Sequence, residues 1–331
     1  MEQVDAVKPL SRRGSERRYL VIAPSRDEAS TLRTTLDSLL RQTLPPAKLV
    51  FVDDGSTDET QAILAEYRGR MPYLDVVRRV DRGVRKVGPG VIEAFNEGLG
   101  TVDLSQFEFL CKLDMDLDLP DGYFEGLVAK MDSDPLLATC SGKPYFREAA
   151  TGELVSEHIA DEFAVGMTKF YRVSAWREIG GFPVSIGWDG IDCHLCRMHG
   201  MRATSFPDPE LRFIHLRPMG SSHISLWHGR MRHGLGAWVM GTPPLFMLAA
   251  TVYRLNKRPR VVGAVAMLLG YLQAWRQGVR RFDKPGYLAF VRSYQHLALV
   301  IGRTRAAERM RQRAAQGGRA PSLDGAMHGH H

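Results

Sequence analysis

The 331-residue sequence has few cysteines and no sign of a cleaved leader. Its four cysteines, at positions 111, 140, 193 and 196, are too few and too irregularly spaced for a disulfide framework, which indicates a reducing compartment. The first 18 residues are charged and polar and contain no apolar run, so they do not resemble a signal peptide. No segment repeats at the period of a solenoid, and one non-repeating architecture is expected.

The composition is that of a folded globular protein with a mild excess of positive charge. Hydrophobic residues make up 44% of the chain and charged residues 24%, proportions that exclude a disordered or fibrous protein. Lysine and arginine outnumber aspartate and glutamate by 44 to 37, which gives a formal net charge of +7. This balance suits an anionic partner without identifying one, and we expect no nucleic-acid partner.

Four segments differ in composition along the chain. Residues 1–18 are polar, and residues 313–331 lack periodicity, so this last segment is expected to be disordered. Between residues 19 and 218, short apolar runs alternate with amphipathic stretches, which predicts an α/β sheet domain. Its predicted strands lie at 19–23, 49–52, 74–77 and 107–113, and a helix is expected after each of them.

The fourth segment, residues 219–312, contains two uncharged apolar runs framed by lysine and arginine. The run at 235–253 has roughly the ~20 residues of a membrane span but is interrupted by glycines and by Pro243-Pro244, and the run at 261–275 is shorter. This pattern predicts a helical extension that lies in the interface of an anionic membrane leaflet. A soluble helical cap and a true span are the alternatives.

Two acidic clusters follow directly on predicted strands. Asp53 and Asp54 come after the second strand, and Asp114 and Asp116 come after the fourth. Ligand sites in open α/β sheets lie at the carboxyl ends of the strands, so both clusters are expected at one crevice. A D-x-D pair can hold a hard cation such as Mg²⁺ or Mn²⁺, although a solvated acidic turn before the next helix explains it equally well.

A basic, glycine-rich loop at residues 81–90 precedes a predicted helix. Arg82 and Lys86 lie in this loop, at a place where an anionic ligand can bind. Glu93 stands where a dinucleotide fingerprint needs its third glycine, so that motif is excluded. These residues are equally compatible with a solvated basic loop that binds no ligand.

A Trp-Asp-Gly-Ile-Asp segment precedes a helix that runs to about residue 199. Asp189 or Asp192 can serve as the N-cap of this helix. Cys193 and Cys196 have C-x-x-C spacing without a second cysteine pair, and we interpret them as packing residues. His215 ends a strand-like run and, taken alone, is typical of a packed polar residue.

Several short motifs follow one another between residues 19 and 218. They are Ala23-Pro-Ser-Arg-Asp-Glu28, Val52-Asp-Asp-Gly-Ser-Thr-Asp58, Leu113-Asp-Met-Asp116, Leu119-Pro-Asp-Gly-Tyr123, Ile179-Gly-Gly-Phe182 and Trp188-Asp189. Their order resembles that of family 2 glycosyltransferases. The resemblance implies a GT-A type nucleotide-binding α/β/α sandwich, which transfers a sugar from a nucleotide sugar to an acceptor hydroxyl with inversion.

The resemblance also implies roles for individual residues. Asp116 and Asp114 correspond to the family's D-x-D and would hold Mn²⁺ or Mg²⁺, with His215 as a further ligand. Asp189 occupies the place of the Asp in the family's E-D motif and would be the general base; Trp188 replaces the Glu of that motif, and Asp192 is a competing carboxylate. The expected donor-binding residues are Pro24, Glu28, Asp53, Asp54, Arg82, Lys86, Asp114 and Arg217.

The Q-x-x-R-W signature of processive synthases is absent, so a single addition is expected. The expected partners are a nucleotide-sugar donor, a lipid-linked or envelope-saccharide acceptor and the inner leaflet of the cytoplasmic membrane, with the protein attached peripherally in the cytoplasm. Two other classes compete with this interpretation. One is a haloacid-dehalogenase-like phosphatase that uses Asp114 and Asp116, although such enzymes carry this motif on their first strand. The other is a non-catalytic membrane-surface protein.

Overall fold

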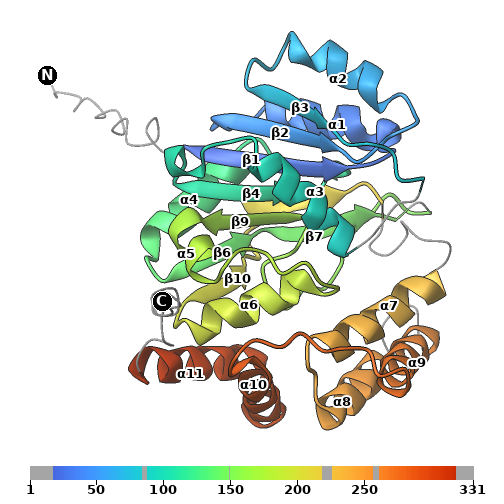
Figure 1. Ribbon diagram of the computed structural model, residues 1–331, viewed down its shortest axis with the longest axis vertical. Coiled ribbons are helices and arrows are strands. Elements are labelled where there is room, and N and C mark those ends of the chain that lie inside the picture. The colour runs from blue at the N-terminus through green and yellow to red at the C-terminus, as the bar shows by residue number, and fades with distance from the viewer. Residues whose placement is uncertain (1–17, 84–87, 149, 218–225, 256–260, 318–331) are drawn as a thin grey trace, which may run out of the picture.

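The first, second and fourth strands of the chain are neighbours in a central seven-stranded sheet (Figure 1). The computed structural model describes residues 18–83, 88–148, 150–217, 226–255 and 261–317. The strand order is β10-β6-β9-β4-β1-β2-β3, and β9 is antiparallel to both neighbours whereas the other pairs are parallel. The strands are β1 (Tyr19–Ser25), β2 (Lys48–Asp53), β3 (Leu74–Arg78), β4 (Phe109–Leu113), β6 (Leu137–Ser141), β9 (Thr168–Arg172) and β10 (Arg202–Ser205).

Helices cover both faces of this sheet, which confirms the α/β/α sandwich. Successive side chains of a strand point to opposite faces, so Tyr19 and Val21 of β1 join the core on one face, and Leu20 and Ile22 join the core on the other. Because both faces of β1, β2 and β4 are buried, these strands read as apolar runs, whereas β3 lies at the sheet edge and is partly exposed. All four predicted strands agree with the structure within two residues. The helices are α1 (Ala29–Leu40), α2 (Thr60–Arg68) and α4 (Tyr123–Ser133) on one face, and α3 (Pro89–Leu99), α5 (Val173–Glu178) and α6 (Trp188–Met198) on the other.

A second, four-stranded sheet brings the end of the domain back to the D-x-D. Its strand order is β5-β11-β7-β8, and β11 runs antiparallel to β5 with His215 opposite Leu117. His215 therefore lies beside the residue that follows Asp116. The strands are β5 (Leu117–Asp118), β7 (Lys143–Arg147), β8 (Leu154–Ser156) and β11 (Arg212–His215), and short 3₁₀ turns occur at η2 (Leu104–Gln106) and η3 (Pro209–Leu211).

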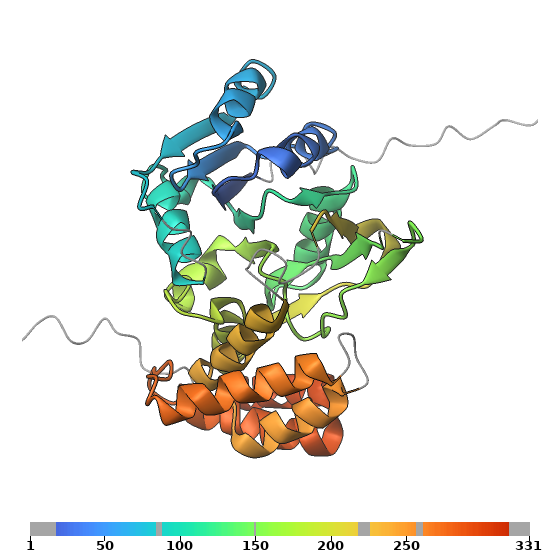
Figure 2. The ribbon, with the colours of Figure 1, turned by 90° about the vertical axis from the view of Figure 1, so that its right-hand side faces the viewer.

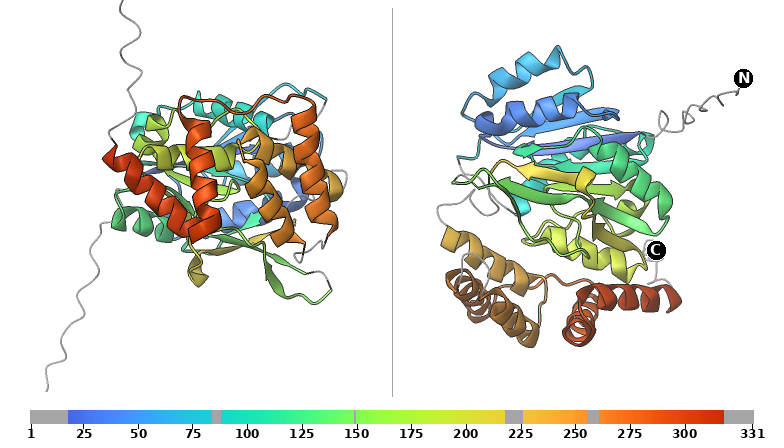
Figure 3. Two further views of the ribbon diagram at one scale, coloured as in Figure 1. Left: turned by 90° about the horizontal axis from the view of Figure 1, so that it is seen from below. Right: turned by 180° about the vertical axis from the view of Figure 1, so that it is seen from behind.

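Within the described residues, five helices form a layer below the sheet domain (Figures 1 and 2). They are α7 (Leu226–Val239), α8 (Pro244–Arg254), α9 (Val262–Arg276), α10 (Tyr287–Ile301) and α11 (Arg303–Gln316). Viewed from below, α10 and α11 lie on one side of this layer and α7, α8 and α9 on the other (Figure 3). Tyr287 and Val291 of α10 join the core that contains α6, which attaches the layer to the sheet domain.

The apolar run at 235–253 is interrupted as predicted, because α7 ends at Val239 and α8 begins at Pro244. The tail predicted from residue 313 is wrong at its start, because α11 continues to Gln316. In the ranges that the structure covers, no helix is both long and apolar enough to cross a bilayer.

Glycines set the distance between α7 and α9. A Cβ on Gly234 would lie 1.9 Å from the carbonyl oxygen of Met267, and a Cβ on Gly270 would lie 2.0 Å from that of Met231. Only glycine allows this approach of the two backbones, so these residues are contact points in a helix pair. The four cysteines are buried and free, which confirms Cys193 and Cys196 as packing residues.

Candidate active site

A cavity of about 600 Å³ opens at the carboxyl ends of β1, β2 and β4, between the sheet and the C-terminal helices. This is the edge at which open α/β sheets bind ligands. Asp53, Arg82 and Asp192, which the sequence also predicts as site residues, do not line it, and Lys86 lies outside the described residues. The predicted residues that line it are Pro24, Glu28, Asp54, Asp114, Asp116, Asp189, His215 and Arg217.

Two arginines hold Asp54 at the cavity wall. Arg79 Nη1 lies 2.5 Å from Asp54 Oδ1, and Arg82 Nη2 lies 2.7 Å from Asp54 Oδ2. Arg82 also pairs with Glu93 at 3.1 Å. Arg82 therefore holds Asp54 in position at the cavity. The sequence had suggested that Arg82 contacts the donor directly.

Asp53 stabilises the turn that carries Asp54. It is fully buried, and its Oδ1 accepts a hydrogen bond of 2.8 Å from the backbone nitrogen of Ser56. Its other carboxylate oxygen accepts a hydrogen bond from the side-chain amide of Gln61. Both oxygens are thus engaged within the protein, so the expected contact between Asp53 and a nucleotide does not fit this arrangement.

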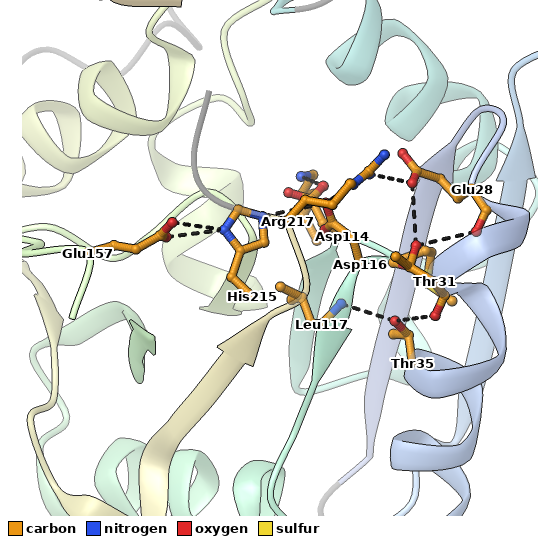
Figure 4. A network of polar contacts seen from close by, with 11 residues as sticks. Glu28, Thr31, Thr35, Asp114, Asp116, Leu117, Glu157, His215 and Arg217 are labelled. Atoms are coloured by element: carbon orange, nitrogen blue, oxygen red, sulfur yellow. Dashed lines mark hydrogen bonds and ion pairs between the residues drawn. The ribbon is translucent and has the colours of Figure 1, made fainter. Parts of the chain in front are cut away.

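Asp116 joins a chain of charged side chains at the cavity (Figure 4). Its Oδ2 accepts hydrogen bonds from Arg217 Nη2 at 2.9 Å and Nε at 3.2 Å, and lies 3.4 Å from His215 Nε2. Arg217 also pairs with Glu28, and His215 Nδ1 lies 3.1 Å from Glu157 Oε2. The network thus joins residues that are far apart in the sequence.

Helix α1 fixes the backbone of the D-x-D turn (Figure 4). The Thr31 hydroxyl donates to the carbonyl of Met115 at 3.1 Å, and the Thr35 hydroxyl accepts from the backbone nitrogen of Leu117 at 3.0 Å. These bonds clamp the residues on both sides of Asp116. Its carboxylate is therefore held in one position.

The charges of this network decide its protonation. Burial alone would raise the pKa of Asp116, but the hydrogen bond and charge of His215, and then Arg217, lower it to about 2. Burial would lower the pKa of His215, but Asp116 and Glu157 raise it to about 9. Both ring nitrogens of His215 thus face carboxylates, Nε2 facing Asp116 and Nδ1 facing Glu157, and its expected role as a metal ligand stays a prediction.

One carboxylate oxygen of Asp116 is not engaged by the network. Its Oδ1 is buried and has no hydrogen-bond partner among the described residues. No group of three or more His, Cys, Asp or Glu side chains in those residues could hold a metal by itself. Mg²⁺ commonly binds through one or two carboxylates plus substrate phosphates, so Asp116 fits such an ion. Asp114 is close by and pairs with Lys112.

We predict that the contact between His215 and Asp116 stabilises the fold most between about pH 4 and 6.5. The pKa of His215 is raised from 6.5 to about 9, so its contribution is complete below 6.5 and is lost as the pH rises through 9. The pKa of Asp116 is lowered from 3.8 to about 2, so its contribution is lost as the pH falls through 2. The alkaline loss is on the order of 3 kcal/mol.

Denaturant unfolding at pH 6.5 and pH 9 with a chelator present measures this loss. The difference between wild type and His215→Gln cancels the contributions of the other titrating groups. The free energy of unfolding should fall more steeply with pH in the wild type than in His215→Gln. Equal pH dependence in both proteins would contradict the assignment.

Asp189 reaches the cavity from the first turn of α6. The helix follows Gly187, whose φ of 74° is a left-handed conformation that favours glycine. The backbone of Gly166 lies so close that a Cβ there would be 3.1 Å from Asp189 Oδ2. The absence of a side chain at position 166 therefore leaves room for the carboxylate.

Asp192, the competing candidate for the base, points into the protein core. Its side chain is completely buried, pairs with the equally buried Lys169 and accepts a hydrogen bond of 2.6 Å from the Tyr171 hydroxyl. Lys169 also donates to the carbonyl oxygen of Asp189. Asp192 is thus held away from a ligand, and its lysine fixes the backbone of Asp189.

Trp188, which stands in place of the expected Glu, packs between two lysines. Lys112 Nζ lies 5.5 Å and Lys169 Nζ 5.4 Å from the centre of its ring. Lys112 pairs with Asp114 at the cavity and Lys169 pairs with the buried Asp192, so the tryptophan lies between a lysine of the site and a lysine of the core.

Sequence analysis missed both lysines, and it also missed Glu157 and Arg79. Lys112 could have been identified because it lies in the middle of the apolar strand β4, and a buried charge requires a partner. Arg79 and Glu157 lie outside every motif, and only the fold places them near Asp54 and His215.

Comparisons with known proteins agree with this geometry. The family model of glycosyl transferase family 2 matches residues 20–185, about half of the chain. The poly-β-1,6-N-acetyl-D-glucosamine synthase of Staphylococcus epidermidis is 26% identical over 125 residues, which are 38% of this chain and 28% of that protein. The chain thus covers only about a quarter to just over a third of the length of the curated relatives it matches.

Two solved structures show the same fold. The mannosyltransferase PcManGT from Pyrobaculum calidifontis, solved with GDP-Man and Mn²⁺, has a TM-score of 0.51 and 20% identity over 93% of this chain and 89% of that one. GalNAc-T7, solved with UDP, GalNAc and Mn²⁺, has a TM-score of 0.52 and 14% identity over 83% of this chain and 56% of that one.

The match to the family model argues against the phosphatase alternative. The chain therefore belongs to glycosyl transferase family 2 and has a GT-A type of fold.

Proposed function

We propose that the protein transfers one sugar, with inversion, from a nucleotide sugar to a hydroxyl group of a lipid-linked or envelope-saccharide acceptor. The observation that carries this proposal is one cavity with carboxylates from two directions, Asp114 and Asp116 from the sheet and Asp189 from α6. Transfer needs both a group that neutralises the departing diphosphate and a base for the acceptor. The absence of a Q-x-x-R-W sequence supports a single addition.

Donor binding is assigned to the sheet side of the cavity. Pro24 and Glu28 would line the nucleotide, and Asp54, held by its arginines, would contact the base or ribose. Arg217 lies next to Asp116 and would contact the diphosphate. A divalent cation on Asp116 and Asp114 would neutralise charge on the departing diphosphate.

Asp189 is assigned as the general base. The acceptor O–H bond breaks as its proton passes to the Asp189 carboxylate, and the acceptor oxygen bonds to the anomeric carbon. The bond from that carbon to the diphosphate oxygen breaks, and the nucleoside diphosphate leaves with the electron pair. Attack opposite the leaving group inverts the anomeric centre.

Calorimetric titration of nucleoside diphosphates and nucleotide sugars, with and without Mn²⁺ or Mg²⁺, tests donor binding. One nucleotide should bind at least about tenfold more tightly with the cation, because Asp116 would hold the cation and its charge would favour the diphosphate. Asp116→Asn should remove the effect of the cation, and Asp75→Asn, an exposed carboxylate paired with Lys48, should not. Silence across the whole panel would contradict a nucleotide-sugar donor.

We also infer that the helical layer attaches the protein peripherally to the cytoplasmic face of an anionic membrane. Leu245, Leu248 and Val252 of α8 are 53–66% exposed and follow helical spacing. Val265, Leu269 and Leu272 of α9 form a similar exposed row. Apolar rows of this kind, with arginines beside them, support interfacial binding.

Cosedimentation with phosphatidylcholine–phosphatidylglycerol vesicles tests this attachment. The double variant Leu248→Glu/Leu269→Glu should bind at least about tenfold more weakly, because two charges would enter the interface. Val80→Glu is the matched control, since Val80 is 87% exposed on the sheet domain. Equal binding of all three proteins would rule out this surface.

A further inference from the structure

The charged side chains that line the cavity include carboxylates on the sheet side and are basic where the cavity meets the helical layer. Its carboxylates, which include Asp116 and Asp189, come from the sheet side and from α6. The charged side chains that line it from the described C-terminal helices are Arg232, Arg254 and Arg303, and no carboxylate of those helices lines it. We call this part the cationic lobe and define it by Arg232, His233, Arg254, Gln295 and Arg303.

Few acids are available to balance the lobe. Between residues 226 and 317 the chain contains only two, Asp283 and Glu308. Glu308 pairs with Arg202 and Arg311. In the part of the chain that the structure describes, no carboxylate forms an ion pair with Arg254 or Arg303. An anionic ligand would therefore meet two guanidinium groups, those of Arg254 and Arg303, that pair with no carboxylate of the described residues.

The cations lie close enough to act on one another. Arg254 lines the cavity and is exposed to solvent, yet desolvation by the surrounding protein, and then the charges of Arg230 and Arg303, lower the pKa of its guanidinium. Burial, and then Arg230, Arg254 and Arg232, lower the pKa of His233 to about 4. Asp189 is near enough to oppose that shift, so the lobe adjoins the proposed base.

A buried amide in the lobe points independently to a ligand. Gln295 is 4% exposed and lines the cavity. Its Nε2 donates to the Thr242 hydroxyl at 3.4 Å, but its Oε1 has no hydrogen-bond partner among the described residues. A buried amide oxygen without a donor is unfavourable, and a ligand hydroxyl would supply that donor.

The lobe is apolar on its α8 side. Phe246, Met247 and Ala250 line the cavity, and Arg303 lies 5.4 Å from the centre of the Phe246 ring. The same helix exposes Leu245 and Leu248 on its outer surface. An apolar chain that leaves the lobe along α8 would therefore reach the apolar surface of the layer.

We propose that the cationic lobe binds the phosphate group of an amphiphilic acceptor, with the apolar chain along α8 and the acceptor hydroxyl near Asp189. This inference rests on the proposed function, since it names the acceptor class for the same cavity. Phosphate is favoured because several guanidinium groups match its oxygens with paired hydrogen bonds.

Calorimetric titration with farnesyl phosphate, farnesol and inorganic phosphate tests the lobe, with the protein saturated with its nucleoside diphosphate and again without it. Farnesyl phosphate should bind the wild type. The double variant Arg254→Gln/Arg303→Gln should weaken this binding at least about tenfold, because each charge-assisted hydrogen bond that is lost contributes a large share of the binding free energy. The nucleoside diphosphate should bind the double variant unchanged. Arg292→Gln is the matched control, because Arg292 is an exposed α10 arginine that does not line the cavity.

Each result that contradicts the proposal points to a different part of it. Farnesol binding as tightly as farnesyl phosphate, or the double variant binding like wild type, would overturn the phosphate site. Inorganic phosphate binding as tightly as farnesyl phosphate would overturn the amphiphile in favour of a hydrophilic anion. Nucleotide binding without farnesyl phosphate binding would overturn only this inference, whereas arginine-dependent farnesyl phosphate binding with a silent nucleotide panel would overturn only the proposed transfer.

Discussion

Asp189→Asn is expected to lower the rate of sugar transfer by ~10²–10⁴-fold, the usual contribution of a general base. An amide has the same shape as the carboxylate but cannot accept the acceptor proton. The affinity for the nucleoside diphosphate should stay within about twofold, because the donor-binding groups lie on the sheet side of the cavity. Single-turnover transfer and calorimetric binding of the same variant separate the two effects.

Asp192 provides the decisive comparison. Its carboxylate is enclosed by Lys169 and Tyr171, so Asp192→Asn should act mainly on stability. Asp75→Asn controls for the loss of one carboxylate far from the cavity. An active Asp189→Asn together with a folded but inactive Asp192→Asn would move the base to Asp192.

Lys169→Met is expected to lower the free energy of unfolding by ~3–5 kcal/mol, because it leaves the buried Asp192 carboxylate without its cation. Both side chains of this pair are fully buried. Denaturant unfolding measures the loss. Lys48→Met is the control, since the pair between Lys48 and Asp75 is exposed and such pairs contribute only ~0–1 kcal/mol.

A double variant distinguishes the effect of the Lys169–Asp192 ion pair on stability from its effect on transfer. Lys169→Met/Asp192→Asn removes both charges and should recover a large part of the lost stability, as expected for a coupled pair. Its transfer rate should be lower than that of the wild type, because the hydrogen bond from Lys169 to the Asp189 carbonyl is missing. If the double variant is less stable than Lys169→Met, the two side chains are not coupled as described.

The sheet side of the site could be predicted because its signals are local. Strands β1, β2 and β4 are short apolar runs, and each is followed by polar residues at its carboxyl end. Parallel strands in one sheet bring those ends together, so the sequence alone places Asp54 and Asp116 at one crevice, and the family resemblance adds Glu28.

Strand β9 could not be predicted in the same way. It reads Thr-Lys-Phe-Tyr-Arg, and the charge of Lys169 interrupts the apolar pattern of a buried strand. The lysine is tolerated because Asp192, on α6, neutralises it. That pairing depends on tertiary structure, so neither the strand nor the true role of Asp192 is visible in the sequence.

The way in which the C-terminal helices line the cavity could not be predicted from the sequence either. In the sequence, Gly234 and Gly270 flank or interrupt apolar stretches, whereas in the structure they allow α7 and α9 to pack in contact. The arginines of this layer appear as a diffuse basic region in the sequence. Only the helix arrangement gathers Arg254 and Arg303 around one cavity.

Inverting sugar transfer can be observed directly by phosphorus NMR of the reaction with the nucleotide sugar that binds most tightly. We expect release of the intact nucleoside diphosphate, and proton NMR of the product should show the inverted anomer. We also expect no release from Asp116→Asn at the same protein concentration. Inorganic phosphate as the product, or a retained anomer, would contradict an inverting sugar transfer at this site.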